Sequence, residues 1–203
     1  MERALKAASA AVFLLTSAAW GQQAPSADQA SSSDQHFIDS ALQSELEVAE
    51  LSDLMVQKGQ NADIKQFAQQ LSQSSKSDEK TLSDIAQHLR GKPTEVKLSA
   101  EALAQKDRLD QMSGADFDYQ YLQMMISRHV QDVHDFQLEA QDGQNGEVKG
   151  FAQKTLPTLQ HDLSQAESLD QQVFKAAAAS GSGKAPTSKT WPLDVSGAGE
   201  KAK

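Results

Sequence analysis

The stretch GQNADIKQFAQ, residues 59–69, returns 84 positions later as GQNGEVKGFAQ, residues 143–153. The two copies are identical at seven of their eleven positions. In each copy a glycine can end one helix, and the following asparagine can cap the next one. We therefore interpret the repeat as the turn and first helical turns of two equivalent helical hairpins.

Apolar residues on both sides of each turn recur with helical spacing. In the first hairpin they fall at Ile38, Leu42, Ala49 and Val56 before the turn, and the second helix continues to Gly91. Asp34 can cap the start of the first helix, and Gly59 is expected to end it in the left-handed conformation. The shifted copy gives the same pattern, with Gly143 ending a third helix and Asn145 capping a fourth.

A connection of about 25 residues separates the two hairpins. Within it, Ser99–Met112 is predicted to form a short helix that Ser99 caps and Gly114 ends. A single hairpin cannot bury its apolar face, whereas two hairpins packed together can. The predicted fold is all-α: a ferritin-like four-helix bundle of two repeated hairpins, with a short extra helix in the crossover.

The N-terminus has the pattern of a secretory signal peptide. Arg3 and Lys6 precede an uncharged run over residues 7–21, which is too short for a transmembrane helix of about 20 apolar residues. Cleavage is expected after Gly21, with Ala19 as the alternative. We predict a signal peptide over 1–21, a disordered linker over 22–35, the bundle over 36–173 and a disordered low-complexity tail over 174–203.

The charge and the cysteine content of the chain exclude several classes of partner and of chemistry. The chain carries a formal charge of −9, and removal of residues 1–21 makes it −10. Such an acidic chain is not expected to bind nucleic acid, and the mature chain has no predicted transmembrane segment. It contains no cysteine, which excludes disulfides, thiolate catalysis and a lipid anchor on cysteine. We expect a periplasmic or secreted protein, with outer-membrane association left open and its envelope partner unidentified.

Two polar residues are expected inside the bundle. His129 lies on the apolar face of the third helix, and the 84-residue shift places Glu45 at the equivalent position of the first. Buried polar groups must bond one another, bind a metal or bind water. A di-metal centre would need Glu-x-x-His on two helices, and neither is present. His161 lies at the edge of the fourth helix's apolar face, where Pro157 could re-aim it.

Two segments, SGADFDYQYLQMMISRHV at 113–130 and FAQKTLPTLQHDL at 151–163, resemble a family of exported bacterial proteins, domain of unknown function 4142. The resemblance implies a ferritin-like bundle in the cell envelope with no established activity, and members are often labelled outer membrane proteins. The family pattern has an Asp-His pair where this chain has Ser74 and Ser75. Its first-helix glutamate falls close to Glu47 or Glu50, whereas the repeat indicates Glu45.

Three functions follow as expectations. The first is a non-enzymatic binding protein of the envelope, associated with stress tolerance or surface maintenance, because no catalytic constellation is found. The second is a metal-binding or redox protein that holds iron, manganese or zinc through Glu45 or Glu47, His129 and His161, which must then converge within about 5 Å of one point. The third is an interaction module, which exposure of Leu98, Leu103 and Leu109 in the crossover would favour.

Overall fold

Five α-helices make up the computed structural model of this chain, which describes residues 30–179, with side chains to residue 175. The predicted signal peptide and all but the first residues of the predicted tail lie outside the described residues. The helices are α1 (Ser32–Lys58), α2 (Ala62–Arg90), α3 (Ala100–Asp110), α4 (Gly114–Asp142) and α5 (Gly146–Ala179). The described residues contain no strand, so the all-α prediction is confirmed.

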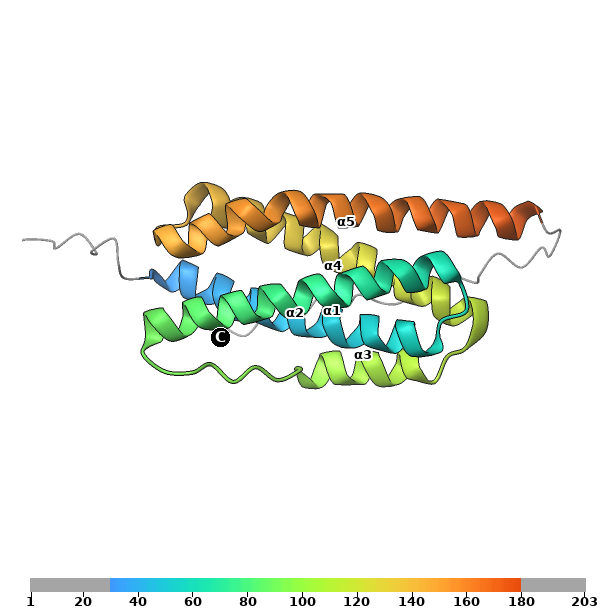
Figure 1. Cartoon of the computed structure of the whole chain (residues 1–203), viewed down its shortest axis with the longest axis horizontal. Coiled ribbons are helices and arrows are strands. Elements are labelled where there is room, and N and C mark those ends of the chain that lie inside the picture. The colour runs from blue at the N-terminus through green and yellow to red at the C-terminus, as the bar shows by residue number, and fades with distance from the viewer. Residues whose placement is uncertain (1–29, 180–203) are drawn as a thin grey trace, which may run out of the picture.

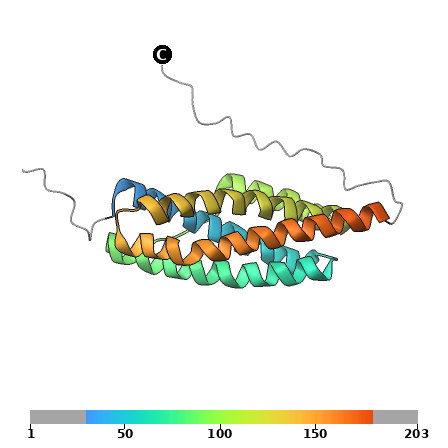
Figure 2. The ribbon, with the colours of Figure 1, turned by 90° about the horizontal axis from the view of Figure 1, so that it is seen from above.

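Four long helices lie alongside one another in an elongated bundle (Figure 1). The closest packing is between the consecutive helices α1 and α2 and between α4 and α5, and the two pairs meet through α1 with α4 and α2 with α5. The connection from α2 to α4 runs back along the bundle, where α3 contacts α1 and α4. Figure 2 shows α4, α5 and α2 in this arrangement from above.

The repeated turns are held by a reciprocal pair of contacts, which we call the clasps. The Asp118 carboxylate lies near the start of α4. It accepts hydrogen bonds from the backbone amides of Gln60 at 3.1 Å and Asn61 at 2.7 Å, in the first of the two repeated turns, between α1 and α2. Asp34, at the equivalent position 84 residues earlier, accepts from the Gln144 amide in the second turn at 2.9 Å. Each pair of helices therefore caps the turn of the other.

The helix ends agree with the sequence-based predictions, with three corrections. The first helix begins at Ser32, inside the predicted linker, because Ser31 and Asp34 form a capping box. Gly59 ends it as predicted, but with φ −60° rather than in the left-handed region. Glycine is needed there because the Met55 side chain lies where a Cβ would project. At the other end α5 continues to Ala179, beyond the predicted bundle limit at residue 173.

The short crossover helix forms where it was predicted, although its end differs. Ser99 caps α3, and Gln111 rather than Gly114 ends it. Gly114 instead opens α4 with φ +66°, a conformation that favours glycine. Of the three crossover leucines, Leu109 is buried, Leu98 is half-buried and Leu103 is 47% exposed, so only Leu103 fits the expected interaction surface.

Two apolar clusters fill the bundle, one towards each end. The first surrounds Met55, Phe67 and Tyr121, near the first turn. The second surrounds Phe37, Phe136 and Phe151, near the second turn, where the Phe37 and Phe136 rings meet edge to face with centroids 4.9 Å apart. Buried polar residues between the clusters form what we call the polar layer, and its central members are Ser44, Glu45, Glu47, Ser75, His129 and Asp132.

Candidate functional site: the buried polar layer

The polar layer draws side chains from α1, α2 and α4, and two further carboxyl groups lie near it. Glu45 on α1 and His129 on α4 are both buried, with 5% and 2% of their surface exposed, as their positions on the apolar faces predict. Asp78 on α2 and Asp162 on α5 are near enough to influence the charge of Glu45. Carboxyl groups thus reach this region from all four long helices: Glu45 and Glu47 from α1, Asp78 from α2, Asp132 from α4 and Asp162 from α5.

Asp132 is bound by a hydroxyl group on the facing helix. The hydroxyl of Ser44 lies 2.8 and 2.7 Å from its two carboxyl oxygens, across the interface between α1 and α4. Burial raises the pKa of Asp132 to about 7, although Ser44 and the nearby Arg128 both act to lower it. This aspartate was not predicted from the sequence. The signal is its spacing, since residues 125, 129, 132, 136 and 139 mark out one helical face.

Glu45 is shifted strongly towards the neutral form. Burial, together with the charges of Asp78, Asp132 and Asp162, raises its pKa to about 8, while a hydrogen bond from Ser75 lowers it. Its carboxyl group is therefore protonated in the folded protein at pH 7. Ser75 is one of the two serines that stand where the family pattern has an Asp-His pair, so this serine pairs with the glutamate that the repeat indicates.

Glu47 and His129 have partners of a different kind. The Glu47 carboxylate forms an ion pair with Arg128 across the interface between α1 and α4. The Nδ1 atom of His129 lies 2.9 Å from the backbone carbonyl oxygen of Met125. Because that carbonyl can only accept, Nδ1 carries the proton, and Nε2 is the ring nitrogen with a lone pair. Burial lowers the pKa of His129, which keeps the imidazole neutral.

His161 does not join these residues. It lies exposed on α5, and its neighbour Asp162 turns partly into the bundle. Ser74, the other serine at the family's Asp-His position, donates to backbone carbonyls of its own helix. Among the described residues, no group of three or more histidine or acidic side chains is close enough to hold a metal ion. Glu45, Glu47 and His129 are thus brought into one layer, with His161 outside it.

A family model describes most of this sequence. The model for domain of unknown function 4142 matches residues 20–169. The chain belongs to this family. The match confirms the resemblance carried by residues 113–130 and 151–163, and it spans the whole polar layer. No curated protein matches the chain.

Solved structures with the same fold come from proteins of low sequence identity. A DUF305 fragment from Deinococcus radiodurans superimposes with a TM-score of 0.63 at 18% identity, over 71% of this chain and 99% of the other. CopM in its Cu(I)-bound form gives 0.59 at 17%, over 68% and 96%. CopM in a silver-bound form gives 0.57 at 16%, again over 68% and 96%. At these identities the likeness shows the fold alone.

Proposed function

We propose that this chain is an exported, non-enzymatic binding protein of the bacterial envelope, associated with stress tolerance or surface maintenance. The observation that carries the proposal is the internal pairing of the polar layer. Ser44 occupies both oxygens of Asp132, Ser75 binds Glu45, and Arg128 neutralises Glu47. A reaction centre needs polar groups that are directed at a substrate. The polar groups of this layer are directed at one another instead.

Export and fold class belong to the same proposal. The charged start and uncharged run of residues 3–21 support secretion into the periplasm or beyond, with outer-membrane association as a variant. No helix in the described range 30–179 is long and apolar enough to cross a membrane. The long connection between α2 and α4, which brings the second pair of helices back beside the first, supports a ferritin-like class.

Metal binding is the second candidate, and the His129 ring favours it. A proton fixed on Nδ1 by a backbone carbonyl leaves Nε2 ready to bind a metal, an arrangement common among histidine ligands. The similarity in fold to copper- and silver-bound CopM points in the same direction. Glu45 or Glu47 would supply the carboxylate for iron, manganese or zinc, and the ion would have to displace the Ser75 or Arg128 partner.

Metal content distinguishes the two candidates. The untagged protein would be purified from the periplasm and its iron, manganese, zinc and copper measured, before and after incubation with each ion. His129→Gln removes the proposed ligand, and His134→Gln changes an exposed histidine of the same helix. We expect all three proteins to hold far less than one ion per chain. The N-terminal residue of the same preparation tests export, which predicts Gln22 or Trp20.

The opposite outcome is equally specific. Close to one ion per chain in the parent and His134→Gln proteins, lost in a folded His129→Gln protein, would replace the non-metal proposal with a metal-binding function. An unprocessed Met1 would contradict export.

A further inference from the structure

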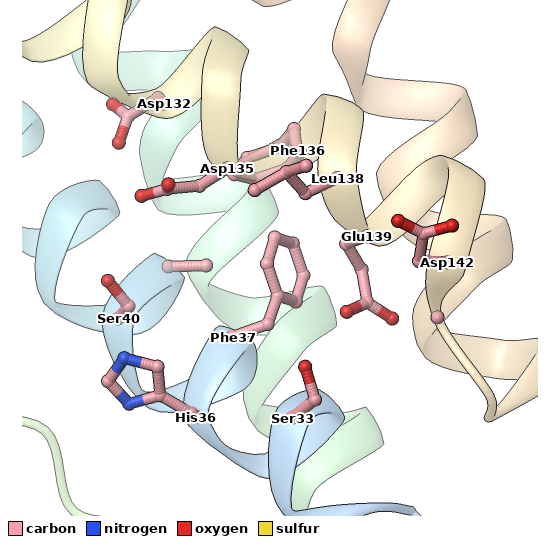
Figure 3. Close-up of a pocket in the computed structure, with 12 residues that line it drawn as sticks. Ser33, His36, Phe37, Ser40, Asp132, Asp135, Phe136, Leu138, Glu139 and Asp142 are labelled. Carbon is pink, nitrogen blue, oxygen red and sulfur yellow. The ribbon is translucent and has the colours of Figure 1, made fainter.

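A groove opens between the first half of α1 and the last part of α4 (Figure 3). Its volume is about 290 Å³, close to the lower limit for small-molecule sites. The rings of Phe37 and Phe136 lie at its centre, with the carboxyl groups of Asp132 and Asp135 to one side and that of Glu139 to the other. No lysine or arginine is among the described residues that line it.

Glu139 supplies the second and independent observation. The residue is only 5% exposed, and its Oε1 atom is buried without a hydrogen-bond partner in the described part of the chain. Its carboxyl group also shares a hydrogen bond with the buried carboxyl of Asp34. A buried, unpaired carboxyl oxygen is costly in a folded protein and marks a place where a ligand can bind.

The repeat shows that this carboxyl group is not needed to build the turn. The residue 84 positions before Glu139 is Met55, and both side chains pack over the glycine that ends their helix, Gly143 and Gly59. The first clasp therefore forms with an apolar residue at this place. Glu139 adds a buried acid to a turn that the fold can make without one.

We propose that this groove binds an alkyl diamine, with one ammonium group at Glu139, the hydrocarbon chain on Phe37 and Phe136, and the second ammonium group at Asp135. The inference rests on the proposed binding role and supplies its ligand class. An ammonium group donates the hydrogen bond that the Oε1 atom of Glu139 lacks, and the two rings offer an apolar surface to the chain between the two charges. A bare metal ion would leave the apolar centre unused, and no three-ligand group is present among the described residues.

Binding should depend on pH. The Glu139 carboxyl group meets Asp34 of α1 and Lys149 of α5, with Asp135 and Asp142 of its own helix and His36 of α1 also around the groove. Burial, followed by the charge of Asp34, raises the pKa of Glu139 to about 7. A bound ammonium favours the ionised carboxylate, so affinity should rise as the pH approaches 7 and level off above it.

The test is calorimetric titration of the mature full chain with putrescine and cadaverine. Glu139→Gln keeps the shape and removes the charge, while Asp116→Asn alters an exposed acid at the far end of α4. We expect one saturable site, weakened about tenfold or more in Glu139→Gln, unchanged in Asp116→Asn, and weaker for butylamine than for putrescine. Circular dichroism confirms that each variant is folded.

Three results would overturn the inference: no saturable binding, equal binding by the parent and Glu139→Gln proteins, or displacement of the diamine by calcium at an equal concentration. The first two would indicate only diffuse attraction to an acidic surface, and the third a site for inorganic cations. None of them alters the metal content measured for the polar layer, so a failure here is separate from a failure of the proposed function.

Discussion

Gly143 ends α4 with φ −52°, a conformation open to every residue, so space rather than backbone freedom requires glycine here. A Cβ at this position would overlap the carboxyl group and the backbone oxygen of Glu139. The same contact, with Met55 in place of Glu139, accounts for Gly59. A helix-ending glycine can thus be required by the side chain four residues before it. The usual reason, a left-handed backbone conformation, does not apply at these two positions.

Gly143→Ala is therefore expected to lower the free energy of unfolding by about 1–3 kcal/mol, the usual cost of forcing an extra methyl group into a packed site. Gly150→Ala is the matched control, because nothing lies within 4 Å of its added Cβ and it stands inside α5. That change should raise stability by about 0.5–1 kcal/mol through helix propensity. Urea unfolding measures both. Similar effects of the two substitutions would mean that the Glu139 side chain moves aside freely.

At the scale of the helices, the clasps determine how the two pairs meet. Asp118 is buried and serves two backbone amides of the first turn that have no other acceptor in the helix ladder. Burial would raise the pKa of its counterpart Asp34, but hydrogen bonds from the Gln144 and Ser31 amides lower it, so that aspartate is ionised. Both clasps thus place a carboxylate at the N-terminus of a helix in the other pair.

Asp118→Ala is expected to reduce stability by about 2–3 kcal/mol, because it removes the charged acceptor of the Gln60 and Asn61 amides. Asp116→Ala, an exposed acid in the first turn of the same helix, should cost less than about 1 kcal/mol. Amide hydrogen exchange at residues 60 and 61 adds a local readout and should become faster only in the Asp118 variant. Equal protection in both variants would contradict the clasp.

The repeat was enough to predict the four long helices, their order and the capping asparagines, since each of these depends on local spacing. It did not predict that Asp34 and Asp118 each cap the other pair's turn, because the ends meet only after the pairs have packed. Local spacing was equally insufficient to place His161. A residue at the edge of an apolar face is buried or exposed according to the rotation of the whole helix, and α5 turns Asp162 rather than His161 towards the bundle.

Across the whole molecule, the buried acids make stability depend on pH in an unusual direction. The pKa values of Glu45, Asp132, Glu139 and Asp162 are raised by burial to about 8, 7, 7 and 6. Above about pH 5 the unfolded chain has lost these protons, while the folded chain keeps each one until the pH passes the raised pKa, so stability falls as the pH rises through this range. His129 acts oppositely, because its lowered pKa makes the folded state lose stability below about pH 6.5.

These raised acids outweigh the one histidine, so the protein is more stable near pH 5 than at pH 8. Glu45→Gln mimics the protonated acid. It should reduce the loss of stability between pH 5 and pH 8 by on the order of 2–4 kcal/mol. Glu101→Gln, an exposed change on α3, should leave the profile unaltered. Urea unfolding at pH 5, 6, 7 and 8 measures the three profiles.

Parallel profiles for the parent and Glu45→Gln proteins would mean that Glu45 is ionised in the folded protein at pH 7. The polar layer would then hold an uncompensated negative charge, and a bound cation would become the better explanation of its buried carboxyl groups.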